Sequence, residues 1–224
     1  MTIAVGFLCG GGEHLILAAD RQITVEGAYK IRREKYTTSK QGFVELACFY
    51  SGEPGTFSEF AQRVEVFLSA QPEVSTGIVQ NAIENTLDTM RLRDPFLEPC
   101  FWLLAGISEL FEAPKLLVFD GKSLFRAHDR VSIIGCGDTS LINYLSDQLH
   151  RPDLTANQGI ALGAYLVKKA TQYVDGCGEP IDVIHGDGVG FQVVEMDKVT
   201  AGIRAIENQE EFLFTWLVQT PFQL

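Results

Sequence analysis

The order of hydrophobic patterns along the 224 residues limits the folds that are open to this chain. Strand-like apolar runs occupy residues 3–8, 15–19, 35–38 and 43–50, and a pair of helical patterns spans residues 57–68 and 75–94. Four more strand-like runs lie within residues 100–134, a second helical pair spans 139–149 and 155–173, and two strands follow at 181–185 and 190–196. Groups of strands alternating with helix pairs exclude a parallel βαβ fold. They predict two antiparallel sheets with helix pairs outside, an α+β four-layer αββα sandwich.

Nothing in the composition divides the chain, so residues 1–224 are expected to form a single domain. No linker, low-complexity segment or short repeat interrupts the pattern. Residues 198–224 are expected to be a C-terminal extension of unknown role, with a Phe-rich segment at 210–217 that is either a helix or an extended arm.

Charge and cysteine usage exclude several classes of partner. The net charge is −11, and the chain lacks the basic stripe that a nucleic-acid or anionic membrane surface requires. No apolar run reaches the roughly 18 residues of a transmembrane helix, and the start has no signal-peptide pattern. The five cysteines are scattered without C-x-x-C spacing, which predicts neither disulfides nor zinc and favours a cytoplasmic protein.

Several short motifs, taken in order, resemble the proteasome β-subunit and HslV-like family of N-terminal nucleophile (Ntn) hydrolases. They cover about residues 2–196: Thr2-Ile3-Ala4-Val5-Gly6, Ala18-Ala19-Asp20-Arg21, Lys35, Ser51-Gly52-Glu53-Pro54-Gly55, Ile134-Gly135-Cys136-Gly137 and Gly176-Cys177-Gly178. Each motif is weak alone, and the shared order and spacing carry the resemblance.

The resemblance implies a catalytic threonine whose base is its own α-amine. Thr2 would be the nucleophile after removal of Met1. Lys35 would lie beside the hydroxyl and stabilise its ionised form, and Asp20 would pair with Lys35. Without the other motifs, Thr2 is simply a residue that opens a strand, and the Lys–Asp pair is a surface salt bridge.

The resemblance also implies an oxyanion hole and a substrate cleft. Backbone N–H groups of Ser51 and Gly52 would form an oxyanion hole, and Gln22, Ile23 and Thr24, with residues 49–51, would line the substrate cleft. The alternatives are an ordinary turn before a helix and ordinary loop packing.

Three supporting positions depart from the family pattern. Cys136 and Cys177 stand where the family has serines, and Val174 aligns with the family's aspartate, one position before Asp175. Either Asp175 reaches the site by a local shift, or polar support is lost because no catalysis is selected. Each cysteine alone is also explained as a small buried hydrophobe. We hypothesise that the two cysteines lie near each other.

The function expected from the resemblance is cleavage of peptide amide bonds in a cytoplasmic homo-oligomeric ring, with peptides or proteins as substrates and no ATPase partner identified. A catalytically silent scaffold subunit and a small-molecule amidase of the same fold are the alternatives. No cofactor or metal is expected: Asp120-Gly121 and Asp187-Gly188 are turn signals. The four histidines are scattered along the chain, at His14, His128, His150 and His185.

Overall fold

The computed structural model describes residues 2–25, 29–93, 101–128, 130–135 and 140–219. Side chains are described for all of these except residues 23–25, 29–31, 91–93 and 213–219.

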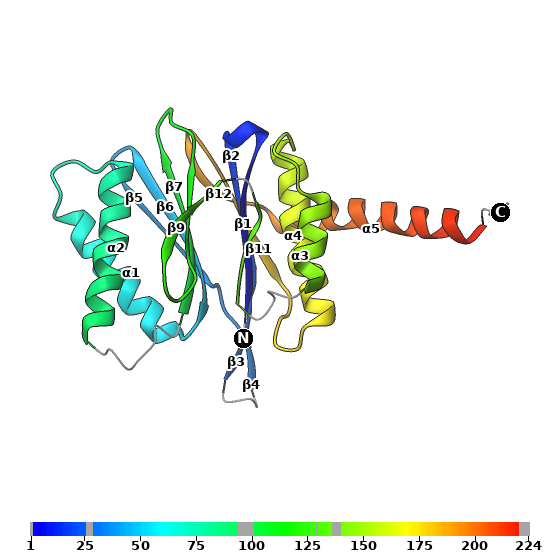
Figure 1. Ribbon diagram of the computed structural model, residues 1–224, viewed down its shortest axis with the longest axis horizontal. Coiled ribbons are helices and arrows are strands. Elements are labelled where there is room, and N and C mark those ends of the chain that lie inside the picture. The colour runs from blue at the N-terminus through cyan, green and yellow to red at the C-terminus, as the bar shows by residue number, and fades with distance from the viewer. Residues whose placement is uncertain (1, 26–28, 94–100, 129, 136–139, 220–224) are drawn as a thin grey trace.

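Two antiparallel five-stranded sheets face each other at the centre of the molecule (Figure 1). The first has the order β10 (Ser132–Gly135), β1 (Ile3–Cys9), β2 (His14–Asp20), β11 (Ile181–Asp187) and β12 (Gly190–Val193). The second has the order β5 (Tyr36–Gln41), β6 (Val44–Gly52), β7 (Phe101–Glu109), β8 (Lys115–Phe119) and β9 (Leu124–Ala127). The α+β sandwich of two antiparallel sheets predicted from the sequence is confirmed.

A pair of helices covers the outer face of each sheet. Helices α1 (Pro54–Ser69) and α2 (Thr76–Arg93) lie on the second sheet, and α3 (Ser140–Leu149) and α4 (Ala156–Tyr173) lie on the first (Figure 1). Side chains cap two of these helices: the Glu53 carboxylate accepts from the first turn of α1, and Thr155 and Gln158 form a capping box at α4. The predicted αββα layering is therefore present.

Three apolar clusters fill the spaces between the four layers. One lies between the sheets and includes Ala4, Leu17, Phe49 and Leu104. The other two lie between each sheet and its helices. Because β1 is buried on both faces, its residues are apolar without alternation, as the sequence shows. The core thus holds the start of β1, immediately after Thr2, in a fixed place.

Two elements differ from the sequence prediction. A hairpin of β3 (Gln22–Val25) and β4 (Tyr29–Arg32) follows β2, in a segment for which no strand was predicted. Helix α5 (Met196–Gln219) begins earlier than the Phe-rich segment, so residues 210–217 are helical. Its middle is tied to α4, because Glu210 accepts from the Tyr165 hydroxyl and pairs with Lys169. Its far end projects from the body (Figure 1).

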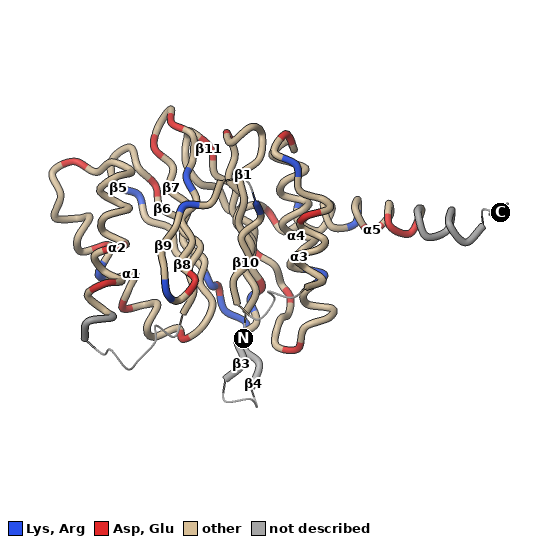
Figure 2. The backbone as a smooth tube through the Cα atoms, in the orientation of Figure 1, with Lys and Arg blue, Asp and Glu red and all other residues tan. Residues whose placement is uncertain are grey.

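Basic and acidic residues are interspersed along the chain in the view of Figure 2. In the described part of the protein this view contains no continuous basic stripe of the kind that follows a nucleic-acid backbone. Among the described residues, no helix combines the length and the apolar character that are needed to cross a bilayer.

Candidate active site

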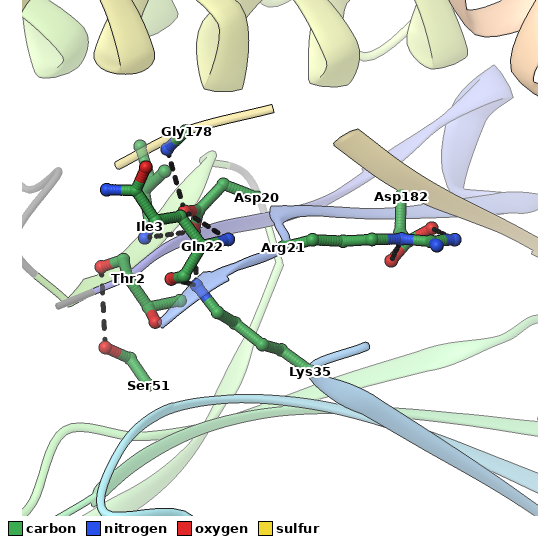
Figure 3. Close-up of polar contacts among 9 residues, drawn as sticks. All are labelled: Thr2, Ile3, Asp20, Arg21, Gln22, Lys35, Ser51, Gly178 and Asp182. Atoms are coloured by element: carbon green, nitrogen blue, oxygen red, sulfur yellow. Dashed lines mark hydrogen bonds and ion pairs between the residues drawn. The ribbon is translucent and has the colours of Figure 1, made fainter. Parts of the chain in front are cut away.

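The Asp20 carboxylate is the centre of a buried polar cluster at the end of β2 (Figure 3). Its Oδ1 accepts from the backbone N–H of Ile3 at 3.0 Å and from Lys35 Nζ at 2.8 Å. Its Oδ2 accepts from the backbone N–H groups of Gln22 and Gly178, at 3.1 and 3.0 Å. Asp20 is only 1% exposed, so these four donors replace the water that a charged carboxylate would otherwise require.

Lys35 is buried as deeply as its partner, also at 1% exposure. It precedes β5 in the second sheet and reaches across to Asp20 in the first, and its ammonium also donates to the backbone carbonyl of Gln22 at the start of β3. Because Lys35 Nζ and the Ile3 N–H share the same oxygen of Asp20, the ammonium lies next to the Thr2–Ile3 peptide. A buried, paired lysine of this kind is therefore unlike the surface salt bridge that was the alternative explanation.

Thr2 is held from the other side by the second sheet. The Ser51 hydroxyl donates to the Thr2 backbone carbonyl at 3.4 Å and so joins β6 to the start of β1. Thr2 is 4% exposed and Ser51 is 2% exposed. The sequence predictions therefore named four residues that the structure brings together: Thr2, Asp20, Lys35 and Ser51 (Figure 3).

Two glycines complete the cluster, and the sequence predictions did not name either as a site residue. Gly135 pairs with Ile3 and has a φ of +87°; a Cβ there would lie 2.1 Å from the Thr2 carbonyl oxygen and 2.4 Å from Ser51 Oγ. Gly178 donates its N–H to Asp20. The signal for both was present, because each belongs to a Gly-Cys-Gly motif, at residues 135–137 and 176–178.

Gln22 joins this site through its backbone, and its side chain has an unused donor. A Cβ at Gly178 would lie 2.2 Å from Gln22 Oε1, so the amide packs against the Gly178 backbone. Gln22 Nε2 is buried without a hydrogen-bond partner among the described residues. Ile23 and Thr24 continue into β3, and their side chains lie outside the described part.

Arg21 fixes the strand end next to Asp20. Its guanidinium donates to both carboxylate oxygens of Asp182 on β11, at 2.8 and 2.5 Å, and the hydrogen bond to Asp182 raises the pKa of Arg21. Asp182 is 4% exposed. This two-bond contact makes the end of β2 rigid, and the sequence predictions did not assign Asp182 any role.

The structure connects the other predicted site residues less directly to the cluster around Asp20. Gly52 ends β6 with a φ of +115°, directly before α1, and is exposed. Cys177 is buried beside Gly178, whereas the Asp175 side chain is exposed to solvent and Val174 packs against the apolar cluster under α4. Cys136 and Met1 lie outside the described residues, so the predicted proximity of the two cysteines stays a prediction.

A separate cavity of about 330 Å³ opens between β5, β6 and α1, with Tyr36, Tyr50 and Phe57 among its lining residues. It lies on the helix side of the second sheet, and its lining includes neither Thr2, Asp20 nor Lys35. We therefore do not include it in the site.

The layered sheets define the class of fold, an αββα sandwich like that of the Ntn hydrolases. Among solved structures, the chain is similar to Anbu (ancestral beta-subunit) from Yersinia bercovieri, with a TM-score of 0.80 and 14% identity over 100% of this chain and 99% of that one. Anbu from Hyphomicrobium sp. strain MC1 has a TM-score of 0.77 and 17% identity over 100% of both chains. A helical assembly of the Anbu complex from Pseudomonas aeruginosa has a TM-score of 0.73 and 12% identity, over 100% and 98%.

These neighbours correct the family suggested by the sequence. The resemblance pointed to proteasome β-subunits and HslV-like proteins, whereas the similar structures are Anbu proteins, which form a distinct family. Each motif that carried the resemblance is weak alone, so their order and spacing predicted the fold but not the family. No protein-family model matches the sequence, and no curated protein matches it. At these identities, the likeness establishes the fold.

Proposed function

We propose that this chain is a threonine-type N-terminal hydrolase that cleaves peptide amide bonds, with Thr2 as the nucleophile after removal of Met1. One observation carries the proposal: the buried Lys35–Asp20 pair is built around the first peptide of β1, because Lys35 Nζ and the Ile3 N–H share Asp20 Oδ1. Burying two charges costs several kcal/mol each before they attract one another. A purely structural role at a strand start needs no such pair.

The proposed chemistry uses the groups around Thr2. The free α-amine of Thr2 takes the proton from the hydroxyl, and the oxygen attacks the substrate carbonyl. The Lys35 ammonium stabilises negative charge on that oxygen. The tetrahedral oxyanion accepts from backbone N–H groups at Ser51 and Gly52. Collapse of the intermediate sends the proton to the leaving amine and leaves an ester on Thr2, which water then hydrolyses.

Gln22 is proposed to bind the substrate next to this nucleophile. Its Nε2 is a buried donor without a partner among the described residues, and such a group costs about 1–3 kcal/mol in the free protein. A substrate carbonyl that accepts from Nε2 would remove that cost, so the amide would favour peptides over shorter amides. Ile23 and Thr24 remain proposed cleft residues on the same strand.

The second candidate is a catalytically silent subunit of the same fold. Asp175 is exposed, Val174 is packed in the apolar cluster, and a thiol stands at Cys177, so the polar support expected around the α-amine is reduced. A silent subunit would keep Met1 and would bind no threonine-directed electrophile.

Assembly with further copies is proposed for either candidate. The similar Anbu complex from Pseudomonas aeruginosa is described as a helical assembly. In this chain, Leu141 and Tyr144 on α3 and Phe212 on α5 are exposed apolar residues that could contact another subunit. Light scattering coupled to size exclusion measures the copy number; a monomer at all concentrations would contradict assembly.

Intact-mass measurement tests the proposed chemistry directly. The protein is incubated with a peptide epoxyketone or peptide β-lactone, and the expected result is a chain that begins at Thr2 with one equivalent of adduct. Thr2→Ala should lose the adduct, and Lys35→Met should slow its formation by at least 100-fold. Lys40→Met is the matched control, because Lys40 is 65% exposed in its pair with Glu45. Retained Met1 without adduct would favour the silent subunit, and turnover of short amides alone would favour the amidase.

A further inference from the structure

Two histidines and an aspartate meet at the end of the first sheet that is far from Thr2. His14 begins β2, and His185 and Asp187 lie two residues apart near the end of β11. Strands β2 and β11 are antiparallel neighbours, with His185 opposite Ile16 and Gly186 opposite Leu15. Residues two apart share a face, so the three side chains are on one face of the sheet. The histidines are scattered along the sequence, and the antiparallel pairing of β2 with β11 brings two of them together.

The cluster is separate from the proposed active site. Cys9, at the far end of β1 from Thr2, is the cross-strand partner of His14. Cys9 lies six residues after Ile3, and a strand rises about 3.3 Å per residue. His14, opposite Cys9, is therefore about 20 Å from the start of β1. A function at His14 is therefore independent of the chemistry proposed at Thr2.

The spacing of the ligand atoms suits a metal ion. His185 Nε2 lies 3.2 Å from His14 Nδ1, and one ligand atom from each of the three residues lies within 4.8 Å of the other two. Two nitrogens bound to Zn²⁺ at 2.0–2.1 Å in a tetrahedral site are about 3.3 to 3.4 Å apart. The two imidazoles are already at the spacing of neighbouring ligands, and the carboxylate needs a shift of at most about 1.5 Å.

The Asp187 carboxylate is oriented for a ligand bond. Asp187 Oδ1 accepts from the Val189 backbone N–H at 2.8 Å, which orients the carboxylate and leaves its second oxygen for a ligand bond.

We propose that His14, His185 and Asp187 bind a divalent transition-metal ion of the Zn²⁺ class. Two imidazoles and one carboxylate suit Zn²⁺ or Co²⁺ better than Mg²⁺ or Ca²⁺, which prefer oxygen ligands. All three residues are partly exposed, so water can fill the fourth position. The ion would join β2 to β11 and stabilise this end of the sheet. The alternative is a hydrogen bond between two histidines without any metal.

Cobalt titration and thermal unfolding of the full chain test this site. After treatment with a chelator, Co²⁺ should produce the visible absorption of a tetrahedral ion and saturate at one equivalent. Zn²⁺ at 100 times its dissociation constant should raise Tm by about 5–10 °C. His14→Gln and His185→Gln should abolish both effects, and His128→Gln, at an exposed histidine, should change neither.

The controls keep the proposal falsifiable even where a histidine variant fails to fold. Asp187→Asn keeps an oxygen that can accept from Val189 N–H, and it should weaken Co²⁺ binding by at least tenfold. Unchanged affinity in a folded Asp187→Asn protein would overturn the three-residue site. So would a folded wild-type protein that shows neither the absorption nor the Tm shift at millimolar metal, or binding that persists when both histidines are replaced.

Discussion

Gly135→Ala is the substitution expected to disturb the start of β1 most directly. The new Cβ would lie 2.1 Å from the Thr2 carbonyl oxygen and 2.4 Å from Ser51 Oγ. The serine hydroxyl can rotate away, but the carbonyl belongs to the backbone and cannot. Overpacking of this kind costs about 1–3 kcal/mol. The φ of +87° adds about 1–2 kcal/mol for any residue with a Cβ.

Gly121→Ala separates these two contributions. Gly121 has the same φ of +87°, but a Cβ there meets its nearest neighbour, Trp102 Nε1, at an ordinary 3.5 Å. Gly121→Ala should therefore lose only the backbone contribution, about 1–2 kcal/mol, whereas Gly135→Ala should lose about 2–5 kcal/mol.

Urea unfolding of both variants measures the two losses. The rate of labelling by the peptide electrophile should also fall by at least tenfold in Gly135→Ala and stay unchanged in Gly121→Ala, because only the first displaces Thr2. Equal losses of stability in the two variants would refute the inference that Gly135 is required by its contact with Thr2.

Three further outcomes are expected. Lys35→Met should cost about 3–5 kcal/mol in urea unfolding because it leaves its carboxylate partner buried and unpaired, whereas Lys40→Met should cost less than about 1 kcal/mol; similar losses would contradict a buried pair. Hydrogen bonds from the side chain and then the backbone N–H of Thr76 lower the pKa of Glu109. This contribution is present above the unfolded value near 4.5 and is lost as pH falls through the lower folded pKa, so Glu109→Gln should reduce Tm more at pH 7 than in acid below pH 4. Gln22→Met should raise stability by about 1 kcal/mol and raise KM about two- to tenfold with little change in kcat.

The layers of the sandwich could be predicted because hydrophobic period and turn residues are local signals. The continuous apolar runs at residues 3–8 and 15–19 indicated strands covered on both faces, and both are buried in β1 and β2. The β3–β4 hairpin was missed although both strands alternate polar and apolar residues, because each alternation is only four residues long. The start of α5 was also missed: Val199, Ile203 and Ile206 recur at the spacing of a helix, but a helix was considered only for residues 210–217.

The site was predictable where a motif marked a residue and not where contact depended on distant strands. Asp20 and Lys35 stood out through their sequence context, and the structure pairs them. Asp182 bonds Arg21 from 161 positions away, and nothing local to either residue predicts that contact. The His14–His185 contact, across 171 positions, was hidden for the same reason.

The position of β1 within its sheet restricts how such a protein could be regulated. Strand β1 is hydrogen-bonded to β10 on one side and to β2 on the other, so Thr2 is attached to a strand without a free edge. Moving Thr2 as a switch would require both ladders to open, and amide protons of Ile3–Cys9 should be among the slowest to exchange. Control of such a site would therefore act on entry to it or on the processing of Met1, rather than on displacement of the nucleophile.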